Sequence, residues 1–282
     1  MSMPRQQENP SLLFVDHACH KRTGSFAFLH ELLSQAFTVT DWYYENAYDC
    51  RLEDSSPERY DVILFAEFLP DRRHICVPNV PCVFVPMFDN EWGSKWQWKR
   101  IAAAKMSVLS FCGKLSEHAR ACGVERLLDV RFFPEFSEFK DMCGDPRRIL
   151  LWERGEIGFH TIKSLFAPDD IDSVTLLRHS TKDQSVTPVI TEQDIRNYHI
   201  QIVDTDYLPR KEFMEILRPA GTVLAPRLKE GIGMAYLEAM AMGKVVIAHD
   251  DATMNETIRD GENGFLVNVF NPSRLDMSKI VS

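Results

Sequence analysis

The stretch that decides the fold runs from residue 225 to 267 and reads APRLKEGIGMAYLEAMAMGKVVIAHDDATMNETIRDGENGFLV. An apolar run ends in a glycine-bearing turn, and a helical segment (233–242) leads into a second short apolar run. The turn at residues 230–233 precedes the helix, so backbone N–H groups at the helix start can point at an anion. Gly231 and Gly233 let such a ligand approach the backbone closely. The stretch therefore predicts a strand–helix–strand unit with an anion site.

Short apolar runs alternate with helix-like segments along the whole chain, which predicts parallel sheets with crossover helices. The expected strands are 11–17, 37–43, 61–68, 82–88, 107–112, 127–133, 147–152, 173–179, 200–204, 222–226, 245–250 and 264–267. The expected helices are 24–36, 91–105, 114–122, 159–166, 192–198, 210–217, 233–242 and 255–259. We therefore expect an α/β protein with two Rossmann-like domains, whose parallel sheets face each other across a ligand cleft at the carboxyl ends of their strands.

The domain boundary is expected in residues 133–146, FPEFSEFKDMCGDP, which combine two prolines, a glycine and several acidic residues. Such a composition is typical of a linker between domains. The sequence thus predicts an N-terminal domain at 1–139 and a C-terminal domain at 140–282.

Charge and hydropathy exclude several classes of protein. The formal net charge of −9 argues against a nucleic-acid binder, which would present a basic surface. The apolar runs have strand length, and the polar N-terminus lacks the apolar core of a signal peptide, so we expect a cytoplasmic protein. No Gly-x-Gly-x-x-Gly follows the first expected strand, and no Walker-type phosphate loop is present. These absences argue against an NAD-binding domain and a P-loop NTPase.

Two glutamates flank the start of the 233–242 helix. Glu230 lies just before it and Glu238 lies about one and a half turns into it. Since a carboxylate accepts hydrogen bonds from paired hydroxyls, these residues could grip sugar hydroxyls on either side of a phosphate. A purely structural interpretation is that the helix presents an apolar stripe to the core and leaves Glu238 solvated.

The stretch resembles the signature of the group 1 family of retaining glycosyltransferases, EGFGxxxLEAMAxGxPVI followed by a DGxNGxLV turn. The matching residues are Glu230, Gly231, Gly233, Leu237, Glu238, Ala239, Met240, Ala241, Gly243, Val246, Ile247, Asp260, Gly261, Asn263, Gly264, Leu266 and Val267. The resemblance implies the GT-B fold. It also implies that Glu230 contacts the donor sugar, that Glu238 binds the ribose, and that the amides of Gly231, Ile232 and Gly233 face the diphosphate.

Members of this family carry an arginine and a lysine near the first strand of the C-terminal domain. Here the candidates are Arg154 and Lys163, at a longer separation than usual. A cation beside a departing diphosphate stabilises developing charge, although Lys163 could equally be an exposed helix residue. Tyr236 stands where the family has a small residue or proline, and Arg210 falls near a turn that often caps the nucleobase. The donor pocket is therefore expected to differ in shape.

The acceptor side is expected in the N-terminal domain. The turn after the first strand contains Gly24, which in this fold borders the cleft and approaches the donor phosphate or the acceptor. Asp89 follows a strand and could orient or deprotonate an acceptor hydroxyl, or simply close an Asp-Asn turn. His17 and His20 lack further ligands at metal-site spacing, so we expect no bound metal.

Residues 91–100, EWGSKWQWKR, interleave three tryptophans with basic residues. This pattern suits peripheral contact with the inner face of a membrane, stacking on sugar rings, or core packing.

The sequence thus predicts a metal-independent glycosyltransferase that needs no cofactor. It would move a sugar from a nucleoside-diphosphate sugar to a glycan or lipid-linked acceptor, and the resemblance implies retention of configuration. Two alternatives remain: a sugar-nucleotide epimerase of similar fold, and a degenerate or truncated protein that binds nucleotide sugar or scaffolds a partner.

Overall fold

The computed structural model describes residues 9–45, 52–69, 77–90, 95–139, 141–178, 189–205 and 208–281. The chain divides into two compact units, an N-terminal unit (Met1–Arg131) and a C-terminal unit (Phe132–Ser282). The division falls directly before the expected linker (133–146) and precedes the expected boundary between residues 139 and 140.

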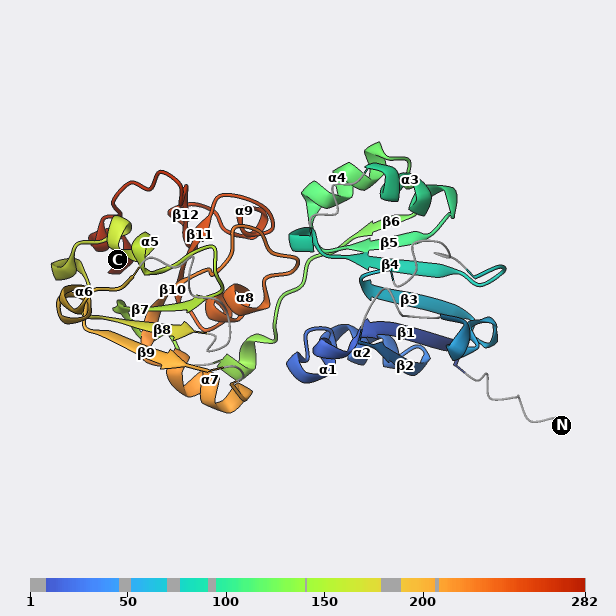
Figure 1. Cartoon of the computed structure of the whole chain (residues 1–282), viewed down its shortest axis with the longest axis horizontal. Helices are drawn as coiled ribbons and strands as arrows, with labels where there is room; N and C mark the ends of the chain where they lie inside the picture. Colours follow the sequence, from blue (N-terminus) through green and yellow to red (C-terminus); the bar gives the residue numbers. More distant parts are fainter. Residues whose placement is uncertain are drawn as a thin grey trace. The chain divides into compact units, whose positions relative to one another are not determined.

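The N-terminal unit contains a six-stranded parallel sheet in the order β2-β1-β3-β4-β5-β6 (Figure 1). Its strands are β1 (Ser11–His17), β2 (Thr38–Tyr44), β3 (Val62–Glu67), β4 (Cys82–Pro86), β5 (Ser107–Ser110) and β6 (Leu127–Asp129). Its helices are α1 (Ala18–Thr23), α2 (Ala27–Ser34), α3 (Lys95–Ala103) and α4 (Gly113–Ala121), with short 3-10 turns η1 (Leu52–Ser55), η2 (Pro57–Arg59) and η3 (Phe88–Asn90). The central strands are continuous apolar runs because parallel sheets are covered on both faces.

The C-terminal unit contains a second six-stranded parallel sheet, in the order β12-β11-β10-β7-β8-β9 (Figure 1). Its strands are β7 (Asp145–Glu153), β8 (Ser173–Arg178), β9 (Ile200–Asp204), β10 (Ala220–Leu224), β11 (Val245–His249) and β12 (Phe265–Val267). Its helices are α5 (Phe159–Leu165), α6 (Glu192–Asn197), α7 (Arg210–Leu217), α8 (Met234–Ala241), α9 (Met254–Thr257) and α10 (Met277–Val281), with 3-10 turns η4 (Phe136–Phe139) and η5 (Pro168–Asp170). Helices α8 and α9 contact β11.

The predicted α/β class with two parallel sheets is confirmed, and each expected strand overlaps an observed one. The expected helix 24–36 is wrong at its start. Gly24 instead ends α1 in a left-handed conformation (φ 68°), and α2 begins only at Ala27. Residues 91–94 of the expected helix 91–105 lie outside the described residues. Helix α10 was not predicted.

Candidate functional site

The strand order of the C-terminal unit reverses between β7 and β10, which are neighbours in its sheet. Open α/β sheets bind ligands at such a switch point, outside the carboxyl ends of the strands. Arg154 directly follows β7, and the loop that contains Glu230 follows β10. The topology therefore brings these two sequence-predicted residues to the same edge of one sheet.

The glycine-bearing turn leads directly into α8. Gly231, Ile232 and Gly233 are buried, and Gly233 is the N-cap of α8 in a left-handed conformation (φ 81°). A glycine has no side chain with which to accept hydrogen bonds from the first N–H groups of the helix. An anion that reaches the start of α8 could therefore accept them, and the anion site stays a prediction.

Tyr236 occupies the space next to this turn. Its side chain is almost fully buried, and its hydroxyl lies 3.3 Å from Thr253 Oγ1. Burial raises the pKa of the Tyr236 hydroxyl. A Cβ atom on Gly233 would overlap the Tyr236 ring. The large residue that departs from the family pattern is thus accommodated because residue 233 is glycine.

Glu238, the predicted ribose-binding residue, pairs with a cation. Arg210 Nη1 donates to Glu238 Oε1 at 2.7 Å, and the two side chains are 57% and 11% exposed. The Arg210 guanidinium also lies 5.9 Å from the centroid of the Phe139 ring. Sequence reasoning placed Arg210 only loosely near the nucleobase. It did not predict the contact with Glu238, because the two residues come from different helices.

Arg154 lies over an aromatic surface. Its guanidinium carbon is 4.6 Å from the centroid of the Trp152 ring, and that ring is 5.7 Å from the ring of Phe213 on α7. Trp152 and Phe213 also line a small apolar pocket with Leu150, Leu217, Val223, Leu224, Ala225, Pro226, Ala235 and Tyr236. The Trp152 ring holds Arg154 close to the switch point, where a cation could meet a diphosphate.

A partly buried ion pair lies at the same edge of the sheet and was not predicted from the sequence. Glu153 ends β7, and its Oε2 accepts a hydrogen bond from Arg178 Nε, at the end of β8, at 2.5 Å. Its Oε1 accepts from the backbone N–H of Phe159 at 3.0 Å, which satisfies one donor at the start of α5. The signal for this pair was weak, because charged residues at strand ends are common.

Lys163, the second predicted diphosphate ligand, forms an ion pair with an acidic residue of another helix. Its Nζ donates to Asp194 Oδ1 at 2.6 Å, and this bond raises the pKa of Lys163. Asp194 also closes a capping box with Thr191 at the start of α6. The pair therefore ties α5 to α6. The assignment of Lys163 to donor binding stays a prediction, and this contact weakens it.

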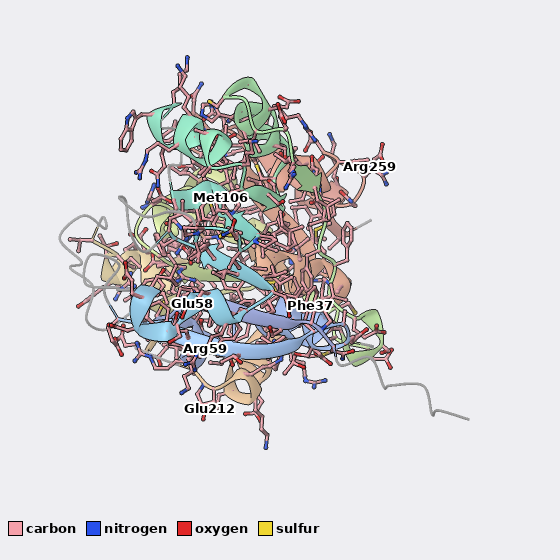
Figure 2. All side chains as sticks on the ribbon, turned by 90° about the vertical axis from the view of Figure 1, so that its right-hand side faces the viewer. Phe37, Glu58, Arg59, Met106, Glu212 and Arg259 are labelled. Atoms are coloured by element: carbon pink, nitrogen blue, oxygen red, sulfur yellow. The ribbon has the colours of Figure 1, made fainter. Side chains whose placement is uncertain are left out.

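The DGENG turn is stabilised by its own side chains. Asp260 Oδ1 accepts from the N–H of Leu266 at 2.9 Å, and Asn263 Oδ1 accepts from the N–H of Arg259 at 2.7 Å. The Arg259 side chain extends outward and pairs with Glu262 at 2.8 Å (Figure 2). These bonds explain the Asp and Asn of the motif without a ligand.

The remaining predicted residues belong to the N-terminal unit. Gly24 ends α1, and its N–H donates to His20 O. Asp89 lies in η3, directly after β4. His20 contacts Asp16 and Glu67. Within the described ranges, no group of three or more His, Cys, Asp or Glu side chains is arranged to hold a metal ion. Among the helices that the structure describes, none has the length and apolar character needed to cross a bilayer.

Comparison with known families agrees with the fold and the glycine-bearing turn. Residues 191–277, which lie in the C-terminal unit, match the glycosyl transferases group 1 family. The predicted resemblance is therefore confirmed, together with the GT-B fold of its structural neighbours.

Individual proteins match this chain either over a short segment or at low sequence identity. Alpha-maltose-1-phosphate synthase of Mycolicibacterium smegmatis is 37% identical over 62 residues, which is 22% of this chain and 16% of that protein. The structure of Anabaena HepE in complex with UDP superposes with a TM-score of 0.62 at 13% identity, covering 96% of this chain and 88% of that one. UDP-GlcNAc 2-epimerase of Neisseria meningitidis gives a TM-score of 0.59 at 9% identity, covering 96% and 89%. The matched segments span only 14% to 38% of the curated relatives' lengths.

Proposed function

We propose that the protein is a transferase that moves a sugar from a nucleoside-diphosphate donor to a glycan or lipid-linked acceptor, with retention of configuration. One observation carries the proposal. Glu230 and Glu238 lie on either side of the glycine turn and the start of α8, at the switch point of a group 1 domain. The residues from 140 to 282 form the donor side in this proposal, and those from 1 to 139 form the acceptor side.

The diphosphate is held by charge and backbone dipoles. The backbone N–H groups of Gly231, Ile232 and Gly233, at the start of α8, donate hydrogen bonds to the phosphate oxygens. Arg154 adds a cation that stabilises the negative charge developing on the leaving diphosphate. In this role the protein needs no bound metal. Lys163 contributes only if it leaves Asp194.

The two glutamates have different tasks. Glu238 accepts hydrogen bonds from the ribose hydroxyls, and Arg210 holds its carboxylate in one orientation. Glu230 contacts the donor sugar. Asp89 and Gly24 act from the N-terminal unit, where Asp89 orients or deprotonates the acceptor hydroxyl. UDP is the first nucleotide to test, because the similar HepE structure holds it.

A binding protein without transferase activity is the second candidate. One observation favours it: Lys163 pairs with Asp194, so a protein side chain engages one of the predicted diphosphate ligands. An epimerase can be distinguished from the transferase and from the binding protein by its products. It would convert one nucleotide sugar into another without an acceptor.

We expect Glu238→Ala to weaken nucleoside-diphosphate binding by about 10- to 100-fold, since a hydrogen bond to a charged group contributes about 1.5–3 kcal/mol. Thermal-shift assays against UDP, GDP, CDP, ADP and dTDP measure this loss. A nucleotide at about a hundred times its dissociation constant should stabilise the wild type by about 2.7 kcal/mol.

Glu262→Ala is the matched control, because Glu262 is an exposed glutamate of the same unit that pairs only at the surface with Arg259. It should leave the nucleotide shift unchanged. A shift that survives in Glu238→Ala would place the nucleotide elsewhere. No shift in the wild type with any of the nucleotides would count against donor binding altogether.

Contact with an anionic membrane through α3 is part of the proposal. Trp98 is buried in the core, which leaves Lys95, Trp96 and Lys99 on the exposed face. The Trp96 side chain is 63% exposed, and the Arg100 guanidinium lies 4.7 Å from its ring centroid. An exposed tryptophan beside lysines suits an interface with anionic lipid, despite the acidic net charge of the chain.

The double variant Trp96→Ala/Lys99→Ala should lose about tenfold or more in binding to phosphatidylglycerol vesicles. Lys99 contributes about 1 kcal/mol near an anionic surface, and the Trp96 ring adds its affinity for the membrane–water interface. Co-sedimentation with anionic and with pure phosphatidylcholine vesicles measures the effect. Phe133→Ala, which removes another well-exposed aromatic ring, is the control. Equal sedimentation of all three proteins would contradict the membrane contact.

A further inference from the structure

The N-terminal unit has its own switch point, between β1 and β3. Its strand order is β2-β1-β3-β4-β5-β6, so the connections that leave β1 and β3 diverge at the carboxyl edge. Four polar residues meet there: Asp16 on β1, His20 on α1, Glu67 at the end of β3 and Asn90 in η3. We call them the His20 cluster.

The imidazole of His20 lies between two carboxylates. His20 Nδ1 is 2.6 Å from Asp16 Oδ1, and His20 Nε2 is 2.7 Å from Glu67 Oε2. An ionised carboxylate only accepts hydrogen bonds, so both ring nitrogens must donate. Only the imidazolium form of histidine carries two N–H donors. The geometry therefore describes a cation shared by two anions.

The groups around the ring favour this charge. Burial lowers the pKa of His20, but hydrogen bonds to Asp16 and Glu67 outweigh it and raise the pKa to about 9. The other neighbours on α1 and β1 are Cys19, whose thiol pKa is raised by burial and by both carboxylates, and His17, whose ring centroid is 6.3 Å away. The ring of Phe26 packs at 5.1 Å from the other side.

Glu67 is held from two sides. His20 binds Oε2, and Asn90 Nδ2 donates to Oε1. Its backbone has φ 65°, a left-handed conformation that is uncommon for a residue with a side chain. Its side chain is 15% exposed, whereas that of Asp16 is 3% exposed. Of the two carboxylates, Glu67 is the one that a ligand can reach.

We propose that His20 is a positioning residue of an acceptor site, in which it fixes the Glu67 carboxylate to accept a hydrogen bond from a hydroxyl of the acceptor. The inference rests on the proposed transferase function and adds a residue to its acceptor side. Three observations support it: His20 and Asn90 both donate to Glu67, His20 also contacts Asp16, and the cluster lies at the switch point. Asn90 directly follows Asp89 in the sequence, so the proposed site adjoins the predicted acceptor residue Asp89. It adds the Glu67 carboxylate to the acceptor side.

The test separates binding of the donor from turnover. The probe is the UDP-sugar that stabilises the wild type, with water and a panel of p-nitrophenyl hexosides as acceptors. His20→Gln should lower kcat about tenfold or more, because Glu67 loses its charged donor, and should leave the dissociation constant of the donor unchanged. Glu67→Gln should lower kcat similarly. His30→Gln is the control, since His30 pairs with the single carboxylate Asp41 elsewhere in the unit.

The pH dependence gives a readout that a purely structural role would not produce. The wild-type kcat should fall as pH rises through about 9, where one N–H of His20 is lost, and His20→Gln should lack this limb. A group whose folded pKa is raised also stabilises the fold below its unfolded value. The stability difference between wild type and His20→Gln should therefore shrink from about pH 6.5 to 9.

Three outcomes would overturn the inference or its basis. Equal kcat in wild type and His20→Gln, with donor binding intact, would contradict the positioning role of His20 and leave the proposed transferase function standing. A neutral His20 ring at pH 7.5 in ¹⁵N NMR spectra removes it even if the variants do not fold. No nucleotide binding by the wild type removes the transferase function and the acceptor site together.

Discussion

Lys244→Met should lower the free energy of unfolding by about 3–5 kcal/mol. The Lys244 side chain is buried, and its Nζ donates to the carbonyl oxygens of Met142 at 2.6 Å and Ala220 at 2.5 Å. Nζ also donates, over longer distances, to the carbonyl oxygens of Arg218 (3.3 Å) and Cys143 (3.5 Å). Methionine fills a similar volume but donates nothing, so these buried acceptors lose their partner.

Urea unfolding monitored by circular dichroism measures this loss. Burial lowers the pKa of Lys244 to about 8, so the three-donor ammonium form still predominates at pH 7, where the comparison belongs. Lys211→Met on α7 removes an exposed lysine of the same unit and should change stability by less than about 0.5 kcal/mol. Similar losses in both variants would show that the four carbonyl contacts contribute little.

Gly233→Ala should cost about 3 kcal/mol in stability and should also weaken nucleotide binding. Two effects add: an alanine is strained at φ 81°, and its Cβ would overlap the buried Tyr236 ring. The turn can relieve the overlap only by moving, and this displaces the N–H groups at the start of α8.

Gly261→Ala separates the two effects. Gly261 has a similar backbone conformation (φ 73°), but nothing lies within 4 Å of an added Cβ atom. The Gly261→Ala variant should therefore lose only the stability that backbone strain costs, about 1–2 kcal/mol. The double variant Gly233→Ala/Tyr236→Ala should show a favourable coupling energy of about 1–3 kcal/mol. Equal losses at the two glycines, or no coupling, would refute the steric explanation.

The fold could be predicted from the sequence because its strands are short and apolar. Ser11–His17 and Ile200–Asp204 were predicted with their observed bounds, as was helix Arg210–Leu217. Helix α1 was missed because Ala18–Thr23 is polar and too short to show an apolar period. The break at Gly24 could be recognised only once its left-handed conformation was known.

The candidate site could be predicted only where it is contiguous in sequence. The turn that contains Gly233 carries its own signature, and the observed strand order brings it to the same edge of the sheet as Arg154. The pairs that Glu238 and Lys163 form could not be predicted, since Arg210 and Asp194 lie on other helices. Which charged side chain meets which depends on how the helices pack on the sheet, and residue spacing does not encode this.

The Lys244 carbonyl contacts also determine where the chain can be cut. Two of its four acceptors, on Met142 and Cys143, precede β7, and Phe139 lies under the Arg210 guanidinium. A C-terminal half expressed from Asp145 onwards, as its first strand would suggest, would lack all three residues. A half that starts at Phe132 keeps them and is the fragment to use for crystallisation or NMR of the nucleotide complex.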